Sequence, residues 1–187
     1  AAAITNVENN SSIPFSFSNP GARSLGMGGA FLGAADDATA AYTNPAGLTG
    51  LGLEQQVGVE LRRTSYDSPF ASGGSAGVAP FDPSGINYGK ASSDTNSLSF
   101  LSWVLPRENW AIALYRHELL NYESAYVSDP TVFGDFFTNP YRARTDIEIV
   151  SYGASFAYDF NDFLSIGAGL SWYDFEIDTS ADRYDAF

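Results

Sequence analysis

A strict alternation of side chains near the end of the chain constrains its fold most. Between residues 164 and 173, large apolar side chains alternate with small or polar ones. The first set is Leu164, Ile166, Ala168, Leu170 and Trp172, and the second is Ser165, Gly167, Gly169, Ser171 and Tyr173. Because successive side chains of a strand point to opposite faces, this period of two predicts a β-strand with one apolar face.

Four earlier segments repeat the pattern less regularly. Strands are predicted at residues 57–61, 97–105, 110–115 and 150–159, and the pattern leaves the faces of the second open. In the third, Trp110, Ile112 and Leu114 oppose Ala111, Ala113 and Tyr115; in the fourth, Val150, Tyr152, Ala154, Phe156 and Tyr158 oppose Ser151, Gly153, Ser155 and Asp159. The predicted connections alternate between long loops, at 66–96 and 123–144, and short turns, at 106–109 and 161–162. Barrels with long external loops and tight periplasmic turns have this rhythm.

The sequence favours an antiparallel transmembrane β-barrel over a soluble β-sandwich, whose strands alternate equally well. A face of serine and glycine fits a small-residue lumen better than a packed sandwich core. Aromatic residues also gather at strand ends, where interfacial girdles place them. They are Trp110, Phe160 and Phe163 beside the short turns, and Trp172, Tyr173 and Phe175 at the far end.

Composition limits the function. Aromatic residues make up 15% of the chain and charged residues only 17%. No stretch reaches the roughly 18 uninterrupted apolar residues of a spanning helix, so a bilayer would be crossed by strands of a closed barrel. A net charge of −13, with one lysine, argues against nucleic acid. The absence of cysteine excludes disulfides and thiolate metal sites.

Residues 1–52 differ in texture from the rest. From Gly21 to Gly52 the chain is rich in glycine and alanine, which allow close backbone packing in a confined space. Asp36 or Asp37 is expected to cap a short helix through residues 38–42, and Pro45 to end it. Ala1-Ala2-Ala3 fits the remnant that a signal peptidase leaves.

Three runs within this block carry a family resemblance. They are Gly-Ala-Arg-Ser-Leu-Gly-Met-Gly-Gly-Ala-Phe from Gly21, Ala-Asp-Asp-Ala from Ala35, and Asn-Pro-Ala-Gly-Leu from Asn44. Together they resemble the N-terminus of the outer-membrane long-chain fatty acid and hydrocarbon transporter family. Related outer-membrane barrels of type IX secretion carry a similar N-terminus. The motif covers about 28 residues, and the remaining chain matches only in its rhythm of strands and loops.

The resemblance implies a fourteen-stranded barrel whose N-terminal segment folds into the lumen as a hatch. Hydrophobic substrates would bind between external loops, pass to a deeper pocket and leave through a gap beside a kinked third strand. Residues 1–52 are accordingly assigned to the hatch, and 53–187 to the first five strands of a barrel that a longer protein completes, since closure takes roughly eight strands. Asn44, Pro45 and Ala46 carry over from the family motif. The further predicted hatch positions are Gly26, Gly28, Gly29, Asp36 and Asp37.

An apolar cluster in the second long loop is the candidate ligand site, although the loop could equally pack on itself or on the first loop. Tyr115 and His117 share the small-residue face, and Ile147 and Ile149 would continue the apolar surface inward. The ligand-binding candidates are Phe133, Phe136, Phe137, Tyr141, Ile147, Ile149, Tyr115 and His117. Nearby, Arg142 and Arg144 could pair with a substrate carboxylate, or face solvent or lipopolysaccharide.

Neither an enzyme activity, nor a cofactor, nor a metal site is predicted. Gly26-Met27-Gly28 lacks the third glycine of a dinucleotide fingerprint, and a packing role is expected for these glycines. The single histidine, His117, stands without a nucleophile elbow, so neither a triad nor a histidine metal site is supported; a satisfied polar residue is expected. Capping or bonding to the barrel wall is favoured for Asp36-Asp37 over acid–base work.

The resulting hypothesis is a channel of the bacterial outer membrane for passive uptake of hydrophobic small molecules such as fatty acids or hydrocarbons. Such a channel would contact outer-membrane lipid and lipopolysaccharide. The alternative is a structural or assembly barrel that anchors or shuttles a protein partner through its external loops. The sequence does not identify the substrate.

Overall fold

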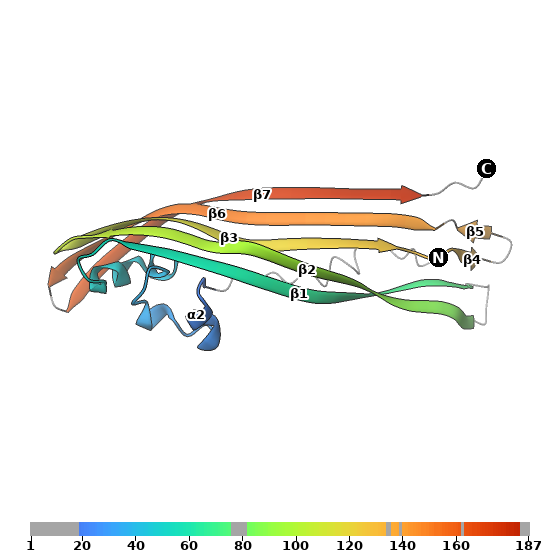
Figure 1. Ribbon diagram of the computed structural model, residues 1–187, viewed down its shortest axis with the longest axis horizontal. Helices are drawn as coiled ribbons and strands as arrows, with labels where there is room; N and C mark the ends of the chain where they lie inside the picture. Colours follow the sequence, from blue (N-terminus) through green and yellow to red (C-terminus); the bar gives the residue numbers. More distant parts are fainter. Residues whose placement is uncertain (1–18, 76–81, 134–135, 139, 162, 184–187) are drawn as a thin grey trace.

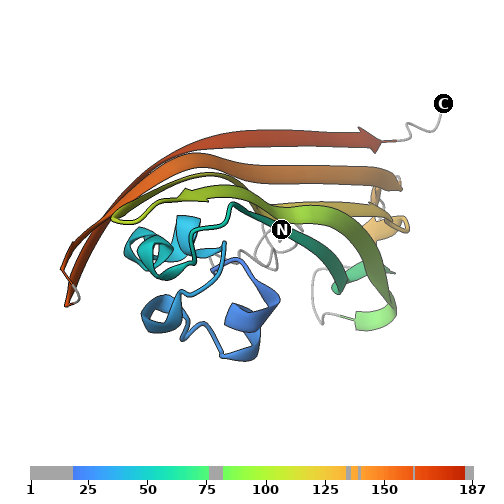
Figure 2. The same ribbon diagram turned by 60° about the vertical axis from the view of Figure 1, so that its left-hand side comes forward.

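The computed structural model describes residues 19–75, 82–133, 136–138, 140–161 and 163–183, which form a curved, mostly antiparallel β-sheet and a short N-terminal segment (Figures 1 and 2). Five strands are long: β1 (Gln56–Ser75), β2 (Asp82–Pro106), β3 (Trp110–Val127), β6 (Tyr141–Asn161) and β7 (Leu164–Arg183). Two are short, β4 (Thr131–Phe133) and β5 (Phe136–Thr138). Within the described residues the sheet order is β5-β4-β1-β2-β3-β6-β7, and the sheet does not close.

The N-terminal segment, residues 19–55, contains four short helices: α2 (Ala22–Gly26), η1 (Leu32–Ala34), α3 (Ala40–Thr43) and η2 (Pro45–Gly50). A helix, α3, forms at the predicted place but begins at Ala40, and no side chain caps it, so the capping expected from Asp36 or Asp37 is wrong. Asp37 Oδ1 instead accepts a hydrogen bond of 2.8 Å from the backbone of Thr39, the residue before α3. Asn44 has φ −153° and ψ 88°, as expected for a residue before proline, and α3 ends there. Among the described residues, no helix has the length and apolar character needed to traverse a membrane.

The sheet has two different faces, and the N-terminal segment covers one of them. We call this the inner face, and Figure 2 shows the sheet curving around the segment on that side. The inner side chains that pack against Phe31, Ala40 and Leu48 of the segment are Phe100, Val104, Ala111, Ala113, Tyr115 and Ala157. Large apolar side chains on the opposite, outer face are exposed: Val57, Val59, Leu61, Leu101, Trp103, Leu114, Tyr152, Phe156, Tyr158, Ile166, Leu170 and Trp172. The predicted faces of the third, fourth and fifth strands are confirmed.

The faces of β2 were open in the sequence because a β-bulge changes their phase. Glu60 pairs with Phe100 and Leu61 with Leu98, which leaves Ser99 as an extra residue on β2. Phe100, Ser102 and Val104 are therefore inner and buried, whereas the odd positions are inner before the bulge. A residue added to one strand shifts the alternation by one, and a single period cannot describe both sides of it.

The predicted long loops at 66–96 and 123–144 are largely wrong, because the strands continue through much of both. β1 runs to Ser75 and β2 begins at Asp82, with pairs such as Thr64 with Thr95 along the ribbon. Serine, threonine, aspartate and asparagine dominate there, so a ribbon without a buried apolar face gave no alternation signal. Pro69 is tolerated since β1 is an edge strand over most of its length.

Strands β2 and β3 stay paired for only a short distance. Their ladder runs from Pro106 with Ala111 to Phe100 with His117, whereas β1–β2, β3–β6 and β6–β7 continue well beyond this level. Both strands carry a bulge near the point of separation, at Ser99 on β2 and at Leu119 on β3. In Figure 1, β1 and β2 bend away from β3, β6 and β7. We call this separation the fork.

Replacement of Phe100 by alanine tests the inner core. Phe100 is 1% exposed between the sheet and the N-terminal segment. Burial of this kind predicts that Phe100→Ala lowers the free energy of unfolding by about 3–5 kcal/mol. Denaturant unfolding monitored by tryptophan fluorescence measures it. Deletion of the Thr64 methyl group in the polar ribbon, by Thr64→Ser, serves as the control and should cost far less; an equal loss would contradict the assignment of the core.

Candidate functional site

The Asn44-Pro45-Ala46 turn rests directly on the glycines of β7. A Cβ added at Gly167 would lie 2.2 Å from Ala46 N and 2.5 Å from Pro45 C, which only glycine avoids. Asn44 braces the turn, since its Nδ2 donates a hydrogen bond of 2.9 Å to Leu32 O. The small residues of the β7 inner face therefore form the seat on which the N-terminal segment packs.

Two further contacts join the N-terminal segment to the sheet. Gly21 N donates a hydrogen bond of 2.7 Å to Glu60 Oε2 on β1, and Thr49 Oγ1 donates one of 3.3 Å to Asp159 Oδ1 on β6. Ser165 of β7 also donates to the same Asp159 oxygen. Hydrogen bonds to β1 and to β6 thus anchor the N-terminal segment on the inner face.

The other predicted hatch residues have local roles. Gly28 and Gly29 have φ of 63° and 85°, a backbone conformation that favours glycine. A Cβ at Gly26, Gly28 or Gly29 would meet nothing within 4 Å of the described residues, so the packing role expected for Gly26 and Gly28 is not found there. The two aspartates have separate partners: Asp37 accepts a hydrogen bond from Thr39 N just before α3, and Asp36 forms an exposed ion pair with Arg23 within the segment rather than with the sheet.

The aromatic ring of Tyr42 on α3 packs against the inner face of the sheet. Its ring centroid lies 5.6 Å from that of Tyr115 and 4.6 Å from that of His117, both edge-on. Tyr115 continues across the sheet, where its hydroxyl lies 2.6 Å from Ser171 Oγ on β7. A Cβ at the intervening Gly153 would lie 2.2 Å from the Tyr115 ring, so glycine lets this ring cross β6.

His117 lies on the inner face, as predicted, with its ring edge-on to Tyr42 and Phe100. It is fully buried, and among the described residues neither ring nitrogen has a hydrogen-bond partner. The expectation of a satisfied polar residue is therefore wrong. The histidine contributes to the inner face as an aromatic ring.

An apolar surface continues along the inner face beyond the N-terminal segment. Leu120, Tyr122 and Ile149 are buried together, and Tyr42 and Ile147 pack against them. The register places Phe175 opposite Ile149 and Ile177 opposite Ile147 on the same face, and both are about two-thirds exposed, at 64% and 65%. We call this set the inner apolar patch: Leu120, Tyr122, Ile147, Ile149, Phe175 and Ile177.

Sequence reasoning identified Ile147 and Ile149 of the inner apolar patch. It placed Tyr115, His117, Ile147 and Ile149 correctly, but it missed Leu120 and Tyr122 because the Leu119 bulge moves them to the inner face. Alternation of Phe175 and Ile177 with acidic neighbours was a signal that could have identified them.

The aromatic loop candidates stay predictions. Phe133 ends β4, Phe136 and Phe137 belong to β5, and Tyr141 begins β6. Their side chains lie outside the described residues.

Arg144 faces away from the inner apolar patch. Its Nε donates a hydrogen bond of 2.8 Å to Asp146, and its Nη2 donates one of 3.2 Å to Glu123. The hydrogen bond and the charge of Asp146, with the charge of Glu123, raise the pKa of Arg144. Arg142 shares its side of β6 and is exposed. A place in solvent therefore fits these arginines better than contact with a substrate in the interior.

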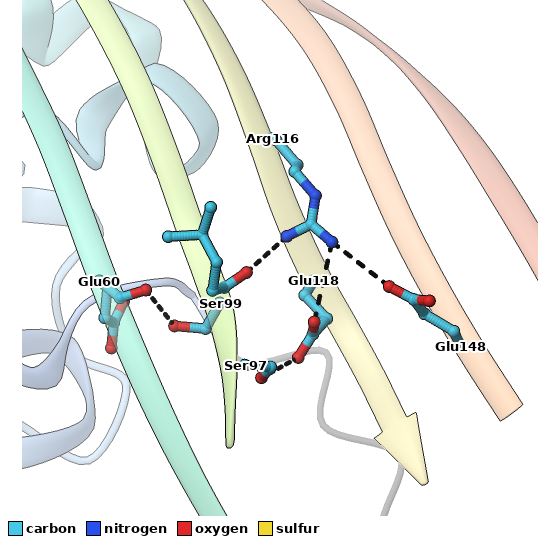
Figure 3. Close-up of polar contacts among 7 residues, drawn as sticks. Glu60, Ser97, Ser99, Arg116, Glu118 and Glu148 are labelled. Carbon is cyan, nitrogen blue, oxygen red and sulfur yellow. Dashed lines mark hydrogen bonds and ion pairs between the residues drawn. The ribbon is translucent and has the colours of Figure 1, made fainter. Parts of the chain in front are cut away.

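A polar cluster occupies the fork (Figure 3). Arg116 of β3 donates through Nη1 to Leu98 O on β2, and its Nη2 lies 3.3 Å from Glu148 on β6 and 3.8 Å from Glu118. Ser97 of β2 donates to Glu118, whose side chain is 3% exposed. The sequence did not single out this cluster, because the bulges that create the fork have no distinct sequence pattern. In the described part of the chain, no group of three or more acidic, histidine or cysteine residues could hold a metal ion.

Comparisons of the chain with protein-family models, curated proteins and solved structures give no match.

Substitution of Gly167 tests the seat of the Asn-Pro-Ala turn. Gly167→Ala places a methyl group against the Pro45–Ala46 backbone, and overpacking of this kind costs about 1–3 kcal/mol. We expect faster amide hydrogen exchange throughout residues 44–50. Gly169→Ala is the matched control, because its Cβ would meet neighbours at ordinary distances of 3.6–3.7 Å. Equal exchange in the two variants would contradict this packing.

Proposed function

We propose that the five long strands belong to the wall of a barrel in the bacterial outer membrane, which admits hydrophobic small molecules such as fatty acids or hydrocarbons. The N-terminal segment would be its hatch. One observation carries the proposal: the apolar side chains change faces partway along the strands. The change falls just beyond the row of paired residues Leu101, Arg116, Tyr152 and Trp172.

Between the short turns and this row, the outer face is apolar. On β7 the outer side chains from Leu164 to Trp172 are half or more exposed, among them Ile166 at 52% and Leu170 at 80%. At about 3.3 Å per residue and a tilt near 40°, this stretch spans roughly 20–25 Å, close to the apolar band of outer-membrane barrels. Lipid is the environment that this belt fits.

Beyond the row, the outer face becomes acidic and the inner face apolar. Asp146 pairs with Asp178, and Glu148 with Glu176, on the outer side of β6 and β7. Carboxylates facing one another need water or cations around them. The inner apolar patch at the same level is partly covered, and exposed apolar surface of this kind usually marks a binding site. A hydrophobic ligand is therefore the occupant we propose for the patch.

The segment packed on the inner face supports the proposed hatch. Phe31, Ala40 and Leu48 of the segment pack against the part of the sheet nearest the short turns. The inner apolar patch lies farther along the strands. Inside a closed barrel, a segment at this place would block free diffusion. Closure takes roughly eight strands, so the proposed barrel needs strands beyond those described. Passive movement down a gradient requires no cofactor.

The fork also supports the proposal. The resemblance implies substrate exit beside a kinked third strand, and β3 bends at the Leu119 bulge where it leaves β2.

A charge on the outer belt distinguishes lipid from water as its surroundings. Leu170→Arg is expected to destabilise the protein in lipid vesicles by about 2–4 kcal/mol, as at the midplane of a barrel. At a position that is 80% exposed, the same change would be nearly neutral in a soluble sandwich. Urea unfolding in vesicles measures the difference, with Glu176→Arg as the control beyond the belt. No loss for Leu170→Arg would contradict the membrane assignment.

Uptake of a radiolabelled long-chain fatty acid or an aromatic hydrocarbon by vesicles containing the full-length protein tests transport. Phe175→Asp introduces a charge into the inner apolar patch, and we expect roughly tenfold slower uptake, equivalent to about 1.4 kcal/mol. Glu176→Gln, its neighbour on the outer face, should leave uptake unchanged. No uptake of either probe, together with a partner protein bound at the strand ends far from the short turns, would favour the alternative assembly role.

A further inference from the structure

The fork is held by side chains where the backbone ladder stops. Beyond Phe100 and His117, β2 and β3 form no further pair within the described residues. Two hydrogen bonds cross this gap instead: Arg116 of β3 to Leu98 O of β2, and Ser97 of β2 to Glu118 of β3. Figure 3 shows both between the diverging strands.

The two sides of the fork are firm by comparison. β2 remains paired with β1 on one side, and β3 with β6 on the other, far past the fork. Ser99, the bulged residue of β2, donates a hydrogen bond of 3.2 Å to Glu60 O and so stays with β1. Each side therefore has its own continuous ladder, and side-chain contacts such as those of Arg116 and Ser97 join the two sides.

The crossing contacts depend on one ionic group. Arg116 Nη1 donates to Leu98 O, while Nη2 faces Glu118 and Glu148. The Arg116 side chain is 22% exposed. The planar guanidinium can serve several acceptors at once, which a lysine ammonium does less well. Glu118, 3% exposed, fills the gap and depends on Arg116 and Ser97 for compensation.

We propose that Arg116 and Glu118 form a latch that sets the width of the opening between β2 and β3. With the latch closed, the fork ends at Phe100 and His117; with it broken, the strands separate further down. Its role in release of a hydrophobic substrate rests on the proposed function, whereas the latch itself does not.

Spin labels on both sides of the fork measure its width directly. These 187 residues contain no cysteine, so within them Asn96→Cys on β2 and Asn121→Cys on β3 provide the label sites. Glu118→Gln keeps the side-chain size and removes the charge, and Arg116→Gln removes the guanidinium with its charge. Both are expected to shift or broaden the distance distribution by about one strand spacing, ~5 Å.

Arg144→Gln is the matched control. Arg144 also contacts two carboxylates, but it lies where β3 and β6 stay paired, so its loss should leave the distance unchanged. Arg116→Lys should give an intermediate width. Unchanged distances in both Arg116→Gln and Glu118→Gln, in folded protein, would overturn the latch.

Vesicle uptake then separates the latch from the proposed function. A wider fork with faster uptake of the fatty acid probe supports both. A wider fork without any uptake, in the parent protein or the variants, leaves the latch standing and contradicts the transport role.

Discussion

The hydrogen-bond ladder between β6 and β7 is the constraint on which the rest of the structure depends. Its register is regular from Tyr141 to Asp159, so the odd-numbered residues of β6 in this range lie on the inner face and the even-numbered ones on the outer face. Gly153 and Gly167 must then lie inside, and Leu170 and Trp172 outside. A slip of one residue would reverse all of these positions.

This register puts small residues on the inner face, and they leave room for the N-terminal segment to pack. Gly167 accepts the Asn-Pro-Ala turn, while Gly153 lets Tyr115 reach Ser171 and leaves its ring beside Tyr42. Farther along β6 and β7, the small inner residues give way to Ile149 and Phe175. The N-terminal segment does not cover this region, and the inner apolar patch begins there. Packing of the segment and exposure of the patch are thus consequences of one change in side-chain size along the strands.

The sequence predicted the fold well where one face is buried. The alternation along β3 and β6 is clear because their inner residues are buried against the N-terminal segment while Leu114 and Phe156 are exposed. The sequence predicted poorly where polar residues dominate both faces, as in the ribbon around Thr64 and Thr95. Bulges at Ser99 and Leu119 were also beyond its reach, because they are set by pairing between strands. Leu120 and Tyr122 of the inner apolar patch, and the whole fork cluster, were missed for that reason.

The central claim is the change of faces along β7, and the depth and oxygen accessibility of spin labels test it most directly. Single cysteines placed in turn from Leu164 to Asp178, in full-length protein in lipid bilayers, would each carry a label. The account predicts high oxygen accessibility at even positions up to Trp172 and high accessibility to a water-soluble nickel complex at even positions beyond it. Even positions that respond to the nickel complex along the whole strand would contradict the account.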